Sequence, residues 1–253
     1  MFEATLPDLA LAERFLTQHG PAHPVLLCGV TGAHIYGFPS PDSDIDMKGI
    51  HLAPTRELVG LHTRAPAHDR LMVFEGVECD LTTHELGHAL ALLLRGSGNV
   101  LERILSPIQL VDGVEELQAL VRASVSRDLS RHYRGFLRGM QREHGLHKRA
   151  KTALYAYRVA LTGMHLMRTG RLETDVRVLA DGRFGLVKEL VAYKAEHAEK
   201  ARIPEALDVC VREDWPVLEA GLAEALESSA LPERVPNRPA IEAWLLRVRK
   251  GSW

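Results

Sequence analysis

Two aspartates separated by one residue, Asp44 and Asp46, are the side chains in this sequence best suited to chemistry. They begin an apolar run, and alternate side chains of a β-strand point to the same face, so we expect the two carboxylates to converge. Mg²⁺ prefers oxygen ligands and usually binds through one or two carboxylates together with substrate phosphates. The spacing therefore predicts a magnesium site on a strand.

A glycine turn lies upstream of this pair. Gly32-Ala33 follows the apolar run that begins at Val25 and precedes a short helical start. A glycine at such a turn brings backbone N–H groups close to an anion, and a helix start favours negative charge there. A glycine turn combined with metal-binding acids predicts a site for a nucleoside triphosphate.

The order of these motifs resembles the DNA polymerase β-type nucleotidyltransferase superfamily. The string GAHIYGFPSPDSDIDMKGI is similar to its branch of RNA-repair nucleotidyltransferases found beside RNA ligases, and so is the later KRAKTALYAYRVALTGMHLMRTG. The resemblance runs from about residue 25 to residue 170. It implies two Mg²⁺ ions, with Mn²⁺ as an alternative. The superfamily usually has Ser where this chain has Ala33, so one phosphate contact is missing or comes from Thr31 or Ser43.

Two metal ions need a third carboxylate, which the strand-like segment 77–81 offers. Glu78 and Asp80 share one face of that segment. The resemblance favours Asp80, since this branch has an Asp on the strand before the helix. Asp44 and Asp46 would then bridge both ions, and Asp80 would complete the catalytic ion and orient the nucleophile. An isolated Asp-x-Asp is usually a solvated turn; the glycine turn at the right distance favours the functional interpretation.

Further nucleotide contacts are expected next to the acids. Ser43 either bonds to a phosphate or metal-bound water, or is an ordinary turn serine. Lys48 lies on the same strand face as Asp46. It would neutralise a phosphate or pair with the carboxylates.

A polar stripe on a later helix is a second candidate for nucleotide binding. Its residues are spaced three and four apart, which is one helix face: Lys148, Lys151, Tyr155, Arg158, Thr162 and His165. Arginine matches phosphate oxygens with two parallel hydrogen bonds, and lysine acts as a point charge. We predict Lys151, Tyr155 and Arg158 as nucleotide contacts. The alternative is a solvated basic face.

The preceding helix carries an arginine stripe. Residues 127–158 contain nine Lys and Arg against two Asp and Glu, in a chain of net charge −2. A concentrated basic segment in an otherwise acidic chain is suited to phosphates. Arg131, Arg134 and Arg138 are therefore predicted to bind RNA. Pairing with nearby acidic helices is an equally good interpretation.

The pattern of elements predicts an α+β fold. Expected strands are 25–28, 45–52, 71–74 and 77–83, with helices over 7–18, 84–94 and 99–105. From residue 113 the chain reads as helical, over 113–123, 126–143, 149–168, 183–199, 204–226 and 239–249. We predict a polymerase β-like nucleotidyltransferase domain, residues 1–112, with a short mixed sheet and flanking helices, followed by an all-helical domain, residues 113–253.

Composition excludes several function classes. Apolar residues make up 46% and charged residues 25%, and no apolar run is long enough for a membrane span. The acidic N-terminal stretch does not resemble a signal peptide, and three dispersed cysteines suggest a reducing compartment. A cytoplasmic protein is expected. The sequence has no P-loop lysine motif, no G-x-S-x-G motif and no zinc-like spacing.

Three functions remain open from the sequence. The favoured one is Mg²⁺-dependent transfer of an NMP from an NTP to an acceptor hydroxyl, with an RNA 3′ end as acceptor and an RNA ligase or other repair enzyme as a partner. The second is nucleotidylation of a protein or small molecule. The third is a catalytically decayed nucleotide-binding module, which the presence of all three carboxylates disfavours.

Overall fold

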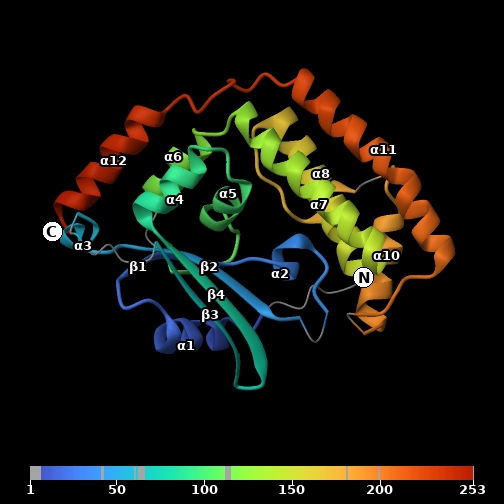
Figure 1. Cartoon of the computed structure of the whole chain (residues 1–253), viewed down its shortest axis with the longest axis horizontal. Coiled ribbons are helices and arrows are strands. Elements are labelled where there is room, and N and C mark those ends of the chain that lie inside the picture. The colour runs from blue at the N-terminus through green and yellow to red at the C-terminus, as the bar shows by residue number, and fades with distance from the viewer. Residues whose placement is uncertain are drawn as a thin grey trace. The chain divides into compact units, whose positions relative to one another are not determined.

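The structure is a computed structural model that describes residues 7–40, 43–59, 61, 66–111, 115–180, 182–198 and 200–252. It separates into two compact units (Figure 1). The sheet unit comprises the described parts of Leu6–Ile35, Asp42–Ser124 and Val235–Trp253, and the helical unit those of Tyr36–Pro41 and Val125–Arg234. The expected division at 112/113 falls outside the described residues. The mixed α+β architecture, with most strands first and mostly helices later, is the expected one.

The sheet unit is built on five strands in the order β3-β4-β2-β1-β5. These strands are β1 (Val25–Val30), β2 (Ile45–His51), β3 (Ala67–Phe74), β4 (Val77–Glu85) and β5 (Gln109–Val111). Strands β2 and β4 pair in parallel, and the other pairs are antiparallel. The sheet is therefore mixed, as expected. The short β5 was not predicted.

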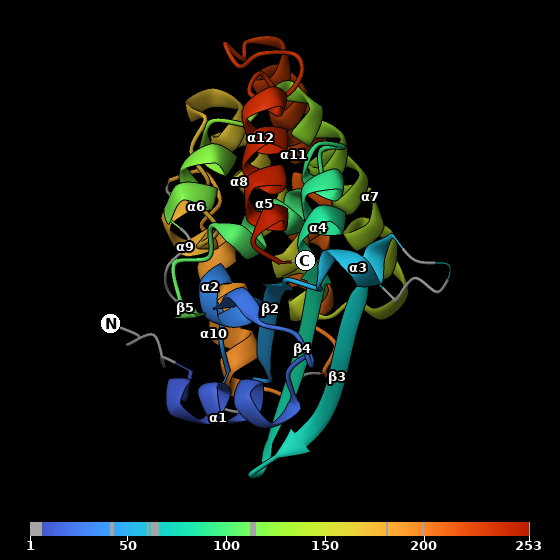
Figure 2. The same ribbon diagram turned by 90° about the vertical axis from the view of Figure 1, so that its left-hand side faces the viewer.

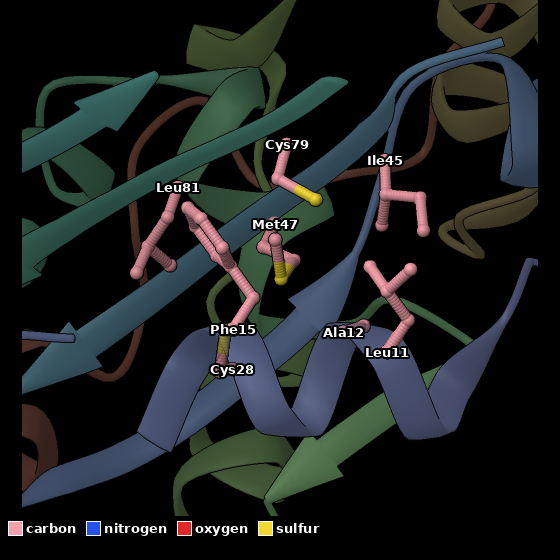
Figure 3. Packing of buried hydrophobic residues seen from close by; sticks show 8 residues of the cluster. All are labelled: Leu11, Ala12, Phe15, Cys28, Ile45, Met47, Cys79 and Leu81. Carbon is pink, nitrogen blue, oxygen red and sulfur yellow. The ribbon is translucent and has the colours of Figure 1, made fainter. Parts of the chain in front are cut away.

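Helix α1 (Leu9–His19) covers one face of the sheet (Figure 2). Asp8 caps it, since its carboxylate accepts a hydrogen bond from the backbone of Leu11 at 2.9 Å. The apolar side of α1 packs on alternate residues of the strands, as Figure 3 shows. The helix contributes Leu11, Ala12 and Phe15, and the strands contribute Cys28, Ile45, Met47, Cys79 and Leu81. Because this face takes every second residue, the residues between them point to the other face.

The other face of the sheet holds helices α4 (Leu86–Leu93) and α5 (Gly98–Ile104) over part of β1, β2 and β4. The helix expected from residue 84 begins at Leu86, because His84 and Glu85 still belong to β4. Glu85 instead caps the helix and accepts a hydrogen bond from Gly87 N at 2.8 Å. Two short elements, α3 (Thr55–Leu58) and α6 (Glu115–Arg122), complete this part of the chain.

The last helix, α12 (Arg238–Lys250), belongs to the sheet unit. Arg249 donates to the carbonyl of Ala53 at 3.0 Å and pairs with Glu85. Arg247 pairs with Glu116 on α6. The chain therefore returns to the sheet unit after the helical unit.

The helical unit is organised around α8 (Ala150–Thr169), most of which is buried. It packs against α7 (Ser130–His147), α11 (Glu205–Glu227) and α10 (Leu186–Glu196), with a short α9 (Val176–Leu179) and a 3₁₀ turn at Arg127–Leu129 alongside. Gly163 allows the close approach, because a Cβ there would lie 2.8 Å from Tyr133 on α7 and 2.9 Å from Leu222 on α11. The single helix expected over 183–199 is shorter, and α9 was not predicted.

A buried polar network joins three helices of this unit. Asp208 and His144 are fully buried and 3.1 Å apart. Asp208 also pairs with Lys148 at 2.9 Å and with Arg212 at 3.1 Å. His144 Nδ1 lies 2.9 Å from the hydroxyl of Thr152. The network places α7, the start of α8 and the start of α11 in one arrangement.

None of the helices in the described part of the chain is long and apolar enough to cross a membrane.

Candidate active site

The glycine turn is in contact with β2, the strand that carries Asp46. Gly32 follows β1 and has a φ of +68°, a conformation that favours glycine. A Cβ at this position would lie 1.9 Å from Oδ2 of Asp46, so only glycine leaves room for that carboxylate. Thr31 N donates to the carbonyl of Asp46 at 2.8 Å. Ala33, which is buried, begins the short helix α2 (Ala33–Tyr36).

Two of the predicted acids are direct neighbours across parallel strands. Asp46 on β2 is the Cα partner of Asp80 on β4. Both are half-buried and lie on the face opposite α1. Neighbouring strands are about 4.8 Å apart, so two carboxylates in register can share a cation. Glu78, the alternative acid, is exposed and lies two residues before Asp80 on the same strand face.

Asp44 and Ser43 lie just before this strand and not on it. The strand begins at Ile45, and both residues are half-buried. Asp44 was expected on the same strand as Asp46. It instead lies one residue before that strand, because pairing with β4 begins at Ile45. Their assignment as metal ligands stays a prediction.

The donor set is compatible with Mg²⁺. Within the described ranges, no cluster of three or more His, Cys, Asp or Glu side chains converges closely enough to hold a metal ion by itself. Mg²⁺ does not need such a cluster, because it keeps several waters and takes the rest of its ligands from one or two carboxylates and substrate phosphates. Asp46 and Asp80 supply two carboxylates of this kind, beside the glycine turn at Gly32.

Lys48 pairs with one of the carboxylates. Its ammonium lies 2.8 Å from Oδ2 of Asp80 and 3.4 Å from the hydroxyl of Thr82. Of the two roles expected for this lysine, the structure contains the pairing with a carboxylate. A cation bound at Asp80 would compete with this ammonium for the same oxygen.

Replacing Lys48 with methionine should strengthen metal binding. Removing the ammonium leaves the carboxylates of Asp46 and Asp80 to repel each other until a cation binds. We expect a lower melting temperature without metal and a larger rise on adding Mg²⁺. The Kd for Mg²⁺ should fall roughly fivefold, which corresponds to about 1 kcal/mol of lost competition. Lys188→Met, at an exposed lysine of α10, is the control. A smaller Mg²⁺-induced rise in Lys48→Met would contradict the competition.

A buried arginine of α5 binds the backbone of β2, the strand that carries Asp46. Arg103 on α5 is 5% exposed and donates to the carbonyl of Gly49 on β2 at 3.1 Å. Burial lowers the pKa of this guanidinium to about 10, which still leaves it charged at neutral pH. No sequence pattern indicated this residue, because an arginine in a short helix is usually exposed.

The polar stripe of α8 is not a solvated face. Arg158 is 1% exposed and Thr162 is fully buried, whereas Lys151 and Tyr155 are half-buried. The Arg158 guanidinium lies 3.9 Å from the centre of the Tyr36 ring, at cation–π distance. The alternative of a solvated basic face is therefore wrong for Arg158 and Thr162, and binding of a nucleotide by Lys151, Tyr155 and Arg158 stays a prediction. Tyr36, the last residue of α2, belongs to this unit and covers Arg158 in the middle of the stripe.

The segment that covers α8 is held by two further contacts within the helical unit. Lys194 of α10 is 7% exposed and donates to the hydroxyl of Ser40 at 2.7 Å. Gly37 has a φ of +87°, and a Cβ there would lie 2.0 Å from Asp175. The sequence did not indicate Lys194, since an isolated lysine in an amphipathic helix is normally solvated.

The arginines expected to bind RNA lie on α7 and are exposed. Arg134 and Arg138 are solvent-accessible, and Arg131 pairs with Asp128 at 2.8 Å while its side chain remains 72% exposed. An exposed row of guanidinium groups on one helix can contact successive phosphates. Binding of RNA by this row stays a prediction.

Comparison with known proteins identifies the family of the chain. A family model, the RNA repair pathway DNA polymerase beta family, matches residues 9–247. Among solved structures, a nucleotidyltransferase-like protein from Exiguobacterium sibiricum 255-15 is similar over 96% of this chain and 80% of its own, at 10% identity and a TM-score of 0.34. No curated protein matches the chain. Because the family model spans nearly all of its residues, the chain belongs to the RNA repair pathway DNA polymerase beta family.

Proposed function

We propose that the protein transfers a nucleoside monophosphate from an NTP to the 3′ hydroxyl of an RNA, with two Mg²⁺ ions. The observation that carries the proposal is the contact of the Gly32 turn with Asp46, and the register of Asp46 with Asp80. This arrangement sets a glycine turn and the start of α2 beside two carboxylates in register. The RNA acceptor is supported by membership of an RNA repair family.

Each site residue has a distinct role in this proposal. The turn at Gly32 and Ala33 binds the triphosphate through backbone N–H groups, with Ser43 as a further donor. Asp46 and Asp80 would hold Mg²⁺, and Asp44 would join them. The metal would lower the pKa of the attacking hydroxyl and stabilise charge on the leaving group. Assignment of Lys151, Tyr155 and Arg158 to the nucleotide is part of the same proposal.

The reaction exchanges a phosphoanhydride bond for a phosphoester bond. The acceptor oxygen forms a bond to the α-phosphorus, and the bond between that phosphorus and the pyrophosphate oxygen breaks. Pyrophosphate leaves with the electron pair, and the proton of the hydroxyl passes to solvent. The chain's own residues position the reactants and neutralise charge, which is the main task of a protein in such transfers.

Label transfer tests the proposal directly. The purified protein is incubated with each of the four NTPs labelled at the α-phosphate, with Mg²⁺ or Mn²⁺, and with an RNA that ends in a free 3′ hydroxyl. The same RNA lacking that hydroxyl is the control. Label on the first RNA alone supports the proposal. Label on a protein or small molecule would identify the alternative acceptor class, and no label with any NTP would contradict transfer altogether.

The arginine row of α7 predicts a distinct effect on RNA. Replacing Arg134 and Arg138 with alanine should weaken RNA binding for all sequences alike, because phosphates carry no sequence information. Each lost phosphate contact lowers the slope of log K against log salt by roughly 0.7 for a single strand, so the double variant should lose roughly 1.4. The affinity for NTP should not change.

The matched control removes the same charge elsewhere. Arg171 and Arg183 are exposed and lie outside α7, so their double alanine variant has the same net charge. Equal effects of the two double variants on the salt slope would mean that only bulk charge matters, and would contradict an RNA site on α7.

A further inference from the structure

Asp46 and Asp80, which are in register on neighbouring strands, lie next to an apolar patch on the edge strand of the sheet. Leu71 on the edge strand β3 is the Cα partner of Asp80, and Val73 is the partner of Glu78. Their exposed fractions are 65% and 64%. Residues in register on neighbouring strands point to the same face, so both apolar side chains lie beside the acids on the face opposite α1. We call Leu71 and Val73 the edge patch.

The strand order fixes the order of these groups in a row across the sheet. Gly32 contacts Asp46, Asp46 is in register with Asp80 on the next strand, and Asp80 is in register with Leu71 on the edge strand. Each step from strand to strand is about 4.8 Å. The row therefore runs from the glycine turn, through two carboxylates, to the edge patch.

In-line transfer assigns the two ends of this row to different reactants. The attacking and leaving oxygens lie on opposite sides of the phosphorus. If the triphosphate rests on the glycine turn, the leaving pyrophosphate lies at that end. The acceptor hydroxyl must then approach from the side of Asp80 and β3. Whatever carries that hydroxyl covers the edge patch.

The charges around the edge patch select the part of the acceptor that lies there. On this face β3 and β4 carry Asp69, Asp80 and the exposed Glu78, and neither strand places a lysine or arginine there. The nearby Lys48 of β2 is already paired with Asp80. Within β3 and β4, the side chains on this face carry negative charge or none, so they would repel a phosphate. A neutral, flat group such as a nucleobase with its ribose fits such a surface better.

We propose that the edge patch binds the terminal nucleoside of the RNA acceptor, with its 3′ hydroxyl toward Asp80 and its phosphates away from β3. The inference rests on the proposed function and specifies which part of the RNA contacts this unit. It makes Leu71 and Val73 determinants of acceptor affinity that do not contact the NTP.

Polar substitution of the edge patch tests the proposal. In Leu71→Ser/Val73→Ser, the KM for an RNA ending in a 3′ hydroxyl should rise roughly tenfold, or about 1.4 kcal/mol, because the apolar area that the nucleoside buries is lost. The KM for NTP should stay within about twofold. Leu246→Ser is the control, since Leu246 lies in the same unit on α12 with an exposed fraction of 53%. Melting temperatures check that all variants fold.

A charge substitution distinguishes a nucleoside from a phosphate. If a nucleoside lies on the patch, Leu71→Lys should not lower the KM for RNA. If Leu71→Lys lowers that KM and makes it strongly salt-dependent, phosphates lie there and the proposal is wrong. A second measurement needs no turnover: an RNA with a photoreactive 3′-terminal base should crosslink to the peptide containing residues 67–74 in the presence of a non-hydrolysable NTP.

The outcomes separate this inference from the proposed function. Label transfer to RNA by the wild type, with an unchanged RNA KM in the double serine variant, would overturn only the edge patch. Absence of label transfer by the wild type would overturn the proposed function. Loss of a dimer in the double serine variant would show that a second copy covers the patch, and label on a protein would show that the acceptor is not RNA; either result overturns the proposal.

Discussion

Replacing Asp46 with asparagine should reduce nucleotidyl transfer by at least about 10³-fold, because the substitution removes the central charge of the row. Asparagine has nearly the same shape, so the contact with the Gly32 turn, where a Cβ would come within 1.9 Å of this side chain, is preserved. The fold should therefore remain intact. Steady-state label transfer measures the loss, and titration with Mn²⁺ measures whether metal affinity falls with it.

Asp69→Asn is the matched control for this prediction. Asp69 lies on the same face of the sheet, on β3, and is the partner of Thr82, so it stands outside the row of Gly32, Asp46 and Asp80. Its substitution should change transfer by less than about threefold. Near-normal activity of Asp46→Asn would show that this carboxylate has no role in catalysis. Asp80→Asn should also impair transfer, and a larger loss in Glu78→Gln than in Asp80→Asn would mean that the wrong acid of β4 was chosen.

Replacing Asp208 with alanine should destabilise the protein by about 3 kcal/mol, the lower end of the range for removing one partner of a buried charge network. Burial alone would raise the pKa of Asp208, but hydrogen bonds from Lys148 and His144 outweigh burial and hold that pKa below its usual value. Without the carboxylate, buried His144 loses its partner. The side chains of Lys148 and Arg212 are 33% and 49% exposed and can reach water, so the cost stays near the lower end.

A drop in melting temperature of roughly 6–12 °C is the expected readout for a chain of this length. Glu205→Ala is the control, since Glu205 also pairs with Lys148 but its side chain is 68% exposed. It should lower the melting temperature by no more than about 2 °C. Equal effects of the two substitutions would contradict a buried network as the main source of stability at this junction.

The same network predicts the response to acid. Burial holds the pKa of His144 below its usual value, so the imidazole is neutral at pH 7. Its Nε2–H then donates to Asp208, while the Thr152 hydroxyl donates to the carbonyl of Arg149 and lies 2.9 Å from Nδ1. Because the unfolded chain binds a proton more readily than this buried ring, the contribution of His144 is complete above pH ~6.5 and is lost as the pH falls below that value.

The sequence predicted which residues of each strand share a face, but not how the strands are arranged. Alternation along a strand correctly placed Asp46 and Lys48 on one face, and separately Glu78 and Asp80. It could not indicate that β2 and β4 are neighbours in parallel register, because β3 is inserted between them in the chain and strand order depends on the whole sheet. The direct pairing of Asp46 with Asp80, and the position of Leu71 beside it, therefore emerged only from the structure.

In the helical unit, the residue spacing was correct but did not show which other segment covers the polar side of α8. The spacing of Lys151, Tyr155 and Arg158 correctly placed them on one side of α8. A helical pattern does not reveal what covers that side, and the covering ring of Tyr36 comes from a segment more than a hundred residues earlier. Lys194 and Asp208 were missed because single charged residues in amphipathic helices resemble solvated ones.

The interleaved course of the chain limits how this protein can be divided or recombined. The segment beginning at Tyr36 belongs to the helical unit, and Val235–Trp253 returns to the sheet unit, where Arg249 binds Ala53 and Glu85. A truncation after residue 112 would remove α12 from the sheet and separate Tyr36 from Arg158. No single crossover between two genes could exchange one unit for a homologous one without breaking these contacts. New acceptor preferences are thus more accessible to such a chain through point substitutions than through the shuffling of modules.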